Sequence, residues 1–363
     1  MTLLLHEFHH SLGARFVEFN GPEIVADYGD WLAEYQALRK SAGILDLSFR
    51  GRICLLGNDR IRFLHGQITN DLKKLAVGEG CYSALTNAKG KMESDLNIFN
   101  LPDEVLIDFE PGLTEKISQR LEKFIVADDV QIADATPHYG LLTVQGPKAA
   151  DVVRAVGLFG GIPEKNLAII KISDATLGEI YLANQDRIGN IGFDLFVPNQ
   201  SLAAVADKLI AAAKSLGGRA CGWTAFETAR IEAGIPRFGA DMDETNLPLE
   251  CGIEDRAVSY NKGCYIGQEV LNRIHSIGHV TKELRGLRLA DDLKALPHKG
   301  DKLFHDGKDV GYITSAMKSP SLNANIALGY VRREANQIST ELTLKGAEQG
   351  SKVKIVELPF VKA

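Results

Sequence analysis

The sequence lacks the features that would tie it to a membrane or to a disulfide framework. No window in its 363 residues approaches 18 uncharged apolar positions, so no bilayer-spanning helix is predicted. The N-terminal segment contains several histidines and Glu7, which is not typical of a secretory signal. Cysteine is scarce, and an odd set of thiols without a Cys-x-x-Cys pair favours reduced thiols in the cytoplasm. The five cysteines are Cys54, Cys81, Cys221, Cys251 and Cys264.

Several fingerprints of catalysis and binding are also missing. There is no P-loop, no Rossmann glycine motif after a strand and no G-x-S-x-G elbow. The formal net charge is −6 and the pI is about 5.9, so we expect no overall attraction to nucleic acid or to an anionic membrane. His6, His9 and His10 form a cluster without a carboxylate at ligand spacing, and no metal site is predicted.

The sequence does contain helical and strand-forming segments in an α+β order. Residues 30–40 predict a helix, residues 81–110 a β-hairpin with its turn at 88–90, and residues 201–218 an amphipathic helix. The order strand, strand, helix occurs twice within 1–280, which predicts two α+β units on antiparallel sheets with a split near 140. Short strands with Gly and Asp turns fill 281–363 and predict a small β-barrel or sandwich.

The most informative segment is KGCYIGQE, in which two glycines lie on either side of a cysteine. Glycine permits unusual backbone angles and the close approach of a ligand, and a nearby lysine favours the reactive thiolate form of a cysteine. The alternative is a glycine-rich loop with an ordinary buried thiol, and local chemistry leaves both open. The segment consists of Lys262, Gly263, Cys264, Tyr265, Ile266, Gly267, Gln268 and Glu269.

This segment resembles the K-G-C-Y-x-G-Q-E signature of the YgfZ family, a branch of the tetrahydrofolate-binding aminomethyltransferase superfamily. Other segments resemble the superfamily along nearly the whole chain, including YSALTNAKGKMESDL, RIGNIGFDLFVP and ARIEAGIPRFGADMDETNLPLE. The resemblance implies a folate-binding fold of two ferredoxin-like α+β units, intertwined within 1–280, and a C-terminal β-barrel in 281–363.

The resemblance also implies a set of site residues around a bound tetrahydrofolate or a one-carbon derivative. Asp194 matches the acidic residue that pairs with the pterin, and Asp95 matches a carboxylate near folate N5, although Ser94 replaces a second aspartate. Arg187 and Arg230 match arginines near the ligand channel, where a guanidinium suits the glutamate tail. Tyr82 is a candidate for stacking on a flat ring.

Three functions follow from these observations, in order of preference. The first is a tetrahydrofolate-binding accessory protein for iron–sulfur cluster assembly or repair, with Cys264 and Asp95 as its reactive residues and with iron–sulfur assembly proteins or client enzymes as partners. The second is an aminomethyltransferase of the glycine cleavage system, which acts on a lipoyl-bearing carrier. The third is a folate-binding regulatory module without catalysis, because a fold does not determine function.

Overall fold

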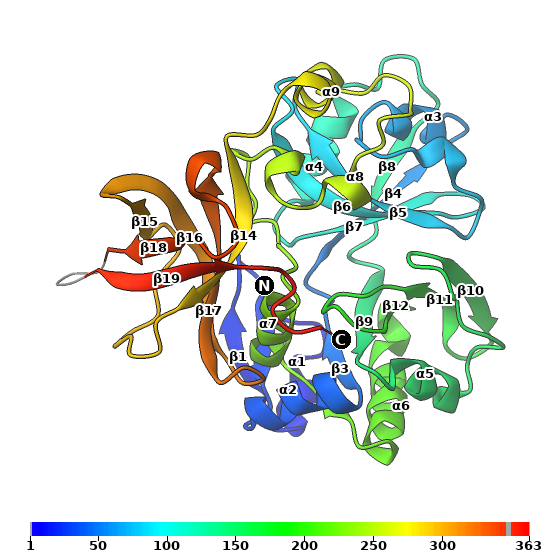
Figure 1. Ribbon diagram of the computed structural model, residues 1–363. Coiled ribbons are helices and arrows are strands. Elements are labelled where there is room, and N and C mark those ends of the chain that lie inside the picture. Colours follow the sequence, from blue (N-terminus) through cyan, green and yellow to red (C-terminus); the bar gives the residue numbers. More distant parts are fainter. Residues whose placement is uncertain (1, 346–349, 363) are drawn as a thin grey trace.

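The computed structural model describes residues 2–345 and 350–362 and arranges them as two α+β units with a β-barrel beside them (Figure 1). The expected α+β class is confirmed. Within the described residues, no helix combines the length and the apolar character that crossing a bilayer requires.

The first unit is built on a five-stranded antiparallel sheet in the order β5-β6-β7-β4-β8. Successive side chains of a strand point to opposite faces. In β6, Met92, Ser94 and Leu96 are fully buried, whereas Asp95 faces the other side of the sheet. The elements are β4 (Gly51–Leu56), α3 (Arg60–His65), β5 (Gly80–Thr86), β6 (Met92–Asn100), β7 (Val105–Phe109), α4 (Thr114–Glu122) and β8 (Gln131–Asp134).

The second unit has a six-stranded sheet in the order β10-β11-β12-β9-β3-β13, in which β3 comes from the N-terminal part of the chain. Helix α6 covers this sheet with apolar residues at helical spacing, from Leu202 through Val205 and Leu209 to Ala213. The elements are β3 (Gly43–Asp46), β9 (Tyr139–Gln145), α5 (Ala149–Val156), β10 (Ile169–Asp174), β11 (Gly178–Asn184), β12 (Gly192–Pro198), α6 (Leu202–Ser215) and β13 (Arg219–Ala220).

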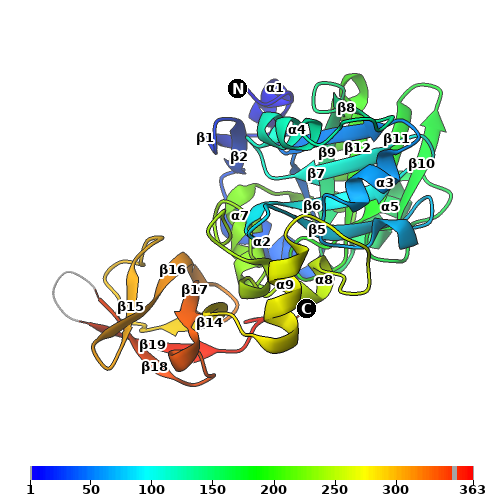
Figure 2. The same ribbon diagram turned by 90° about the horizontal axis from the view of Figure 1, so that it is seen from above.

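Several segments connect these units to the barrel (Figure 2). Helix α7 packs against α2, β2 and the barrel strands β16 and β17, and its residues 228–232 are all buried. The remaining helices and strands outside the barrel are α1 (His6–Ser11), β1 (Arg15–Glu18), β2 (Glu23–Asp27), α2 (Trp31–Lys40), α7 (Trp223–Glu232), α8 (Glu254–Ala257) and α9 (Gln268–Ile277). Short 3-10 helices cover Leu72–Lys74, Asn199–Ser201, Pro248–Glu250 and Arg333–Ala335.

The C-terminal region forms a closed barrel in the order β14-β17-β16-β15-β18-β19, so the barrel alternative is confirmed over the sandwich. Its own apolar core includes Leu287, Ile313 and Val353. The strands are β14 (Lys282–Leu289), β15 (Lys302–His305), β16 (Lys308–Ser319), β17 (Ala324–Arg332), β18 (Glu341–Leu344) and β19 (Ser351–Val356).

Candidate functional site

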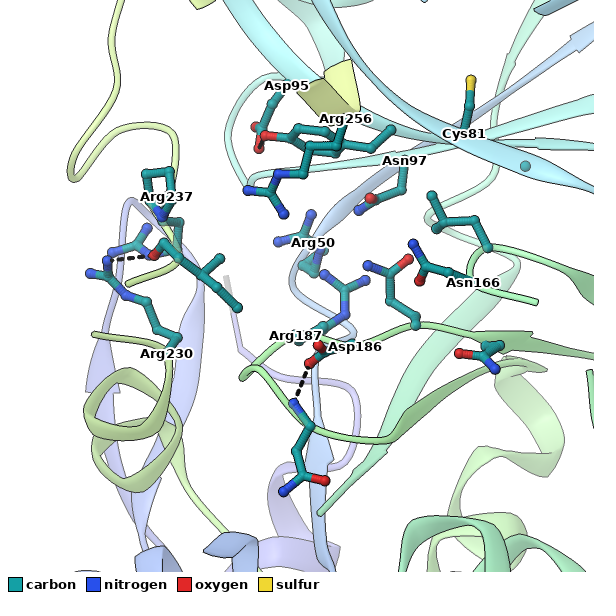
Figure 3. A pocket seen from close by; sticks show the side chains of 18 of the residues that line it. Arg50, Cys81, Asp95, Asn97, Asn166, Asp186, Arg187, Arg230, Arg237 and Arg256 are labelled. Carbon is teal, nitrogen blue, oxygen red and sulfur yellow. Dashed lines mark hydrogen bonds between the residues drawn. The ribbon is translucent and has the colours of Figure 1, made fainter. Parts of the chain in front are cut away.

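A cavity of about 630 Å³ lies between the two α+β units, and most of the expected ligand contacts are on its wall (Figure 3). Strands β5 and β6 supply Tyr82 and Asp95, the loop between β11 and β12 supplies Arg187, and α7 supplies Arg230. The volume lies within the range of about 300–1,000 Å³ that is typical of small-molecule sites.

Asp95 and Tyr82 form a hydrogen-bonded pair on this wall. The Tyr82 hydroxyl donates to Oδ2 of Asp95 at 2.9 Å, whereas the buried Oδ1 atom of Asp95 has no partner within the described residues. Burial and the negative charge of Glu110 raise the pKa of Asp95, against the opposing effect of Arg50. Asp95 therefore changes its protonation state closer to neutral pH than an exposed aspartate does.

A buried ion-pair network supports one side of the cavity. Arg50 and Arg187 both contact Asp108, through Nε of Arg50 at 2.8 Å and Nη2 of Arg187 at 2.9 Å. Burial alone would raise the pKa of Asp108, but the two guanidinium groups outweigh it and hold this pKa well below the usual range. Breaking a buried pair of this kind is costly, so the network fixes the position of both arginines.

A second network joins the cavity to the barrel. Arg230 pairs with Glu227 and Asp241, and Arg237 pairs with Glu227. Against the raising effect of burial, Arg230 and Arg237 lower the pKa of Glu227 to about 2. Oδ1 of Asp241 accepts hydrogen bonds from barrel residues, at 2.6 Å from Thr314 and 2.7 Å from Ser315. The carboxylate of Asp241 therefore contacts both Arg230 of the cavity wall and the barrel.

Asp194 lies behind the cavity wall. Its carboxylate is fully buried, and Nε of Arg187 donates to its two oxygens at 3.1 and 3.0 Å. A ligand in the cavity would reach Asp194 only if the Arg187 side chain moved. In this geometry Asp194 positions Arg187, and direct pairing of Asp194 with a pterin stays a prediction.

Cys264 is exposed, whereas the other four cysteines are buried. It is not among the residues that line the cavity. Its loop instead packs on the tip of the β5–β6 hairpin, where the Thr86 hydroxyl donates to the Ile266 carbonyl at 2.7 Å. Gly267 has a φ of +90°, and a Cβ atom there would lie 2.7 Å from the Asn87 carbonyl oxygen. The loop therefore presents an accessible thiol at the outer end of the hairpin that carries Asp95.

Lys262 has a different role from the one expected of it. Its ammonium group donates to the carbonyls of His65, Ile68 and Asn70, at 2.6, 2.7 and 2.8 Å. No hydrogen bond joins it to Cys264 within the described chain, so it stabilises the end of α3 and the turn that follows.

The other members of the KGCYIGQE segment complete this loop. Gly263 is exposed, and Tyr265 is buried against Leu247, Leu249 and Leu271. Gln268 and Glu269 begin α9.

The structure adds cavity residues that the sequence did not reveal. Arg50, Arg237 and Arg256 line the wall together with Asn97 and Gln185. They come from turns, strands and helices far apart in the chain. Arg237 lies in the ARIEAGIPRFG segment, but the resemblance did not single it out. Within the described ranges, no group of three or more His, Cys, Asp or Glu residues is arranged to hold a metal ion.

Comparison with protein families covers almost the whole chain. Residues 5–262 match the family model described as the GCVT N-terminal domain. Residues 282–362 match the model of the glycine cleavage T-protein C-terminal barrel domain.

Individual proteins agree with these matches. A protein named aminomethyltransferase from Symbiobacterium thermophilum is 30% identical over 367 residues, which cover 99% of this chain and 96% of the relative. A protein of the same name from Bacillus subtilis is 27% identical over 360 residues, or 99% and 98% of the two chains. The crystal structure of glycine cleavage system aminomethyltransferase T from Bartonella henselae is similar with a TM-score of 0.90 and 25% identity, over 100% of this chain and 98% of that one. The fold expected from the sequence is therefore confirmed.

Proposed function

Because the chain belongs to the glycine cleavage T-protein family, we propose that it is a tetrahydrofolate-dependent aminomethyltransferase of the cytoplasm. This function ranks second on the sequence alone and now moves ahead of the iron–sulfur accessory function. The reason is that the reported relatives are similar over their full length and carry this name.

The observation that carries the proposal is the carboxyl group of Asp95 on the wall of a cavity of suitable size. Oδ1 of Asp95 and Oε1 of Gln185 are buried acceptors without a donor in the described residues. Unsatisfied buried acceptors are costly unless a ligand or water supplies the hydrogen bond. A reduced pterin ring carries N–H groups that can supply it, so these residues fit a folate.

The reaction passes the aminomethyl group of a lipoyl-bearing carrier protein to the folate. The folate nitrogens accept the carbon, ammonia leaves, methylene-tetrahydrofolate forms, and the lipoyl sulfur is left as a thiol. Asp95 can take up a proton at one oxygen while the Tyr82 hydroxyl holds the other in place. The ion pairs of Arg50 and Arg187 with Asp108 keep this part of the wall rigid.

The test is a transfer assay with aminomethylated lipoyl carrier and tetrahydrofolate, followed by release of ammonia. We expect turnover by the wild-type protein and a loss of about 10²–10⁴-fold in kcat for Asp95→Asn, as for removal of a general acid–base group. Asp103→Asn is the matched control, because Asp103 is an exposed aspartate in the turn after β6. Tight folate binding without any transfer would instead support the regulatory module.

A second candidate function rests on Cys264. An exposed thiol in the YgfZ-type segment supports a role in iron–sulfur cluster assembly or repair, as nucleophile, redox thiol or transient cluster ligand. The test is complementation of a deletion strain, scored by the activity of iron–sulfur enzymes. If Cys264→Ala restores those activities fully, this function of Cys264 is excluded. Cys54→Ala, at a buried thiol outside the cavity lining, is the control.

A further inference from the structure

The arginines on the cavity wall differ in whether their charge is already paired. Four of them are directed at carboxylates of the protein itself, and their side chains are largely buried. A group with negative charge that approaches them meets a charge that is already balanced. These four residues are Arg50, Arg187, Arg230 and Arg237.

Arg256 of α8 is the exception. Its guanidinium has no carboxylate partner and no hydrogen bond within the residues that the structure describes, and the residue is exposed. Its guanidinium carbon lies 4.6 Å from the centre of the Tyr82 ring, and the side chain projects into the cavity next to Asp95 (Figure 3). Burial raises the pKa of Asp95, and the nearby charge of Arg256 is among the effects that oppose this rise. A free cation therefore lies beside the carboxyl group that is proposed to exchange a proton.

The backbone holds Arg256 in this place. The Asn70 side-chain amide donates to the carbonyl of Arg256 at 3.0 Å and to the carbonyl of Tyr82 at 2.8 Å. One amide thus joins α8 to β5, and the cation stays over the aromatic ring, an arrangement that is itself favourable. The guanidinium is positioned in advance, and its N–H donors are available at the reactive end of the site.

The transfer reaction creates charge of both signs at this end of the cavity. N5 of the folate forms a bond to the methylene carbon while the carbon–sulfur bond breaks, and the electron pair of that bond stays on the sulfur as a thiolate. The N5 proton passes to the carboxylate of Asp95. N10 then displaces ammonia from the same carbon, and the N5 and N10 protons end on the ammonia and on the sulfur. Asp95 serves the nitrogen side of this reaction, whereas the thiolate needs a cation.

We infer that Arg256 is a catalytic residue that donates hydrogen bonds to the sulfur of the carrier as it leaves. The inference rests on the proposed aminomethyltransferase function. A neighbouring arginine favours a thiolate over a thiol, and Arg256 is the arginine of the described cavity wall whose donors are free. It is also more exposed than Asp95, so a lipoyl arm that enters from solvent can place its sulfur at the guanidinium and its amine at the carboxylate.

The experiment measures single-turnover transfer to tetrahydrofolate from two aminomethylated carriers that differ in the leaving atom. One carries the lipoyl group and the other its selenium analogue, and because a selenol is more acidic than a thiol, its anion leaves with less help. We expect Arg256→Gln to slow transfer from the lipoyl carrier about 10²-fold, and transfer from the selenium carrier less than about tenfold. Arg256→Lys keeps the charge without the planar fork and should lie between wild type and Arg256→Gln.

The control variant is Arg333→Gln, because Arg333 is an exposed arginine of the barrel that does not line the cavity. Its transfer rates should match those of the wild type with both carriers. Calorimetry provides a second readout, and the affinity of Arg256→Gln for tetrahydrofolate should stay within about twofold of the wild-type value.

Each outcome decides a separate point. Unchanged transfer by Arg256→Gln overturns the inference, and so does an equal slowing with both carriers, since Arg256 would then act through the Tyr82 ring. A loss of folate affinity as large as the loss of rate also overturns it, because Arg256 would then hold the folate. A wild-type protein that transfers from neither carrier would overturn the proposed function itself. If Arg256→Gln does not fold, Arg256→Met decides, because it removes the charge and keeps an apolar stem over the ring.

Discussion

At the scale of single residues, the pKa values of the carboxyl groups at the site depend on the charges next to them. The charge of Arg50 lowers the pKa of both Asp95 and Asp108, yet the net shifts of the two pKa values have opposite directions. Asp108 contacts two guanidinium groups, whereas Asp95 receives one neutral hydroxyl. At Asp95 the effect of desolvation is the larger one and the pKa is raised, whereas at Asp108 charge pairing is the larger one and the pKa is lowered. Of these two residues, Asp95 is therefore the one suited to exchange a proton.

The hydrogen bond from Tyr82 gives a testable pH dependence. The hydroxyl lowers the pKa of Asp95 because it stabilises the charged form, so its removal in Tyr82→Phe should raise that pKa further. If the carboxylate is the active form, kcat falls as pH drops through this pKa. The acid limb of the kcat profile should therefore move to higher pH in Tyr82→Phe and disappear from the residual activity of Asp95→Asn.

The matched control is Tyr139→Phe, because Tyr139 lies on β9 and does not line the cavity. Its acid limb should coincide with that of the wild type. An acid limb at the same pH in wild type and Tyr82→Phe would show that a group other than Asp95 controls the profile.

At the scale of elements, the loop that carries Cys264 depends on a close approach of two backbones. Gly267 combines a positive φ with contacts of 2.7 Å to the Asn87 carbonyl and 2.9 Å to the Thr86 hydroxyl for a built Cβ. Gly267→Ala should cost roughly 2–4 kcal/mol in free energy of unfolding, from backbone strain and the clash together. The measurement is urea unfolding monitored by circular dichroism.

The variant Gly252→Ala separates the cost of backbone strain from the cost of the steric clash. Gly252 also has a positive φ, +69°, but a Cβ atom there would meet nothing within 4 Å. We expect a loss of only about 1–2 kcal/mol from the left-handed conformation alone. Equal losses in the two variants would mean that the contact with the hairpin tip adds nothing to the stability of the loop.

Elements with clear periodicity could be predicted from the sequence, and uniformly buried ones could not. Helix α6 has one apolar face, and the hairpin of β5 and β6 has a turn at Asn87–Gly90. Helix α7 is buried on several sides and includes Arg230 and Glu232 among its buried residues, so it has no single apolar stripe.

The candidate site was predictable only where a motif or a resemblance marked it. Tyr82, Asp95, Arg187 and Arg230 were found through resemblance and do line the cavity. Arg256 was not found, because its contact with Tyr82 joins residues far apart in the chain and leaves no local signal. The same holds for Lys262, whose three acceptors lie almost 200 residues away in sequence.

At the scale of the whole molecule, acid should weaken the ion pairs of Glu227 with Arg230 and Arg237, which belong to the network that meets the barrel. Glu227 has a pKa of about 2 in the folded protein, against about 4.3 for an unperturbed glutamate. A lowered carboxyl pKa contributes stability that is present above about 4.3 and is lost as pH falls toward about 2. Because Glu227 is partly exposed, we expect a contribution on the order of 2 kcal/mol.

The measurement is the free energy of unfolding of wild type and Glu227→Gln between neutral pH and pH of about 2. The difference between them should be largest at neutral pH and should shrink through the acid range. Glu122→Gln, at an exposed position on α4, should differ from wild type by less than about 0.5 kcal/mol at neutral pH. A constant difference for Glu227→Gln would mean that the loss does not come from its charge.

The hydrogen bonds from Thr314 and Ser315 to Asp241 have a consequence for any attempt to divide the chain. Asp241 also contacts Arg230, so a protein truncated before β14 would lose two donors next to a buried guanidinium. Water would then reach the guanidinium of Arg230, and this part of the cavity wall would lose its fixed position. Exchanging barrels between relatives should therefore succeed only when the incoming barrel carries hydroxyl residues at the positions of Thr314 and Ser315.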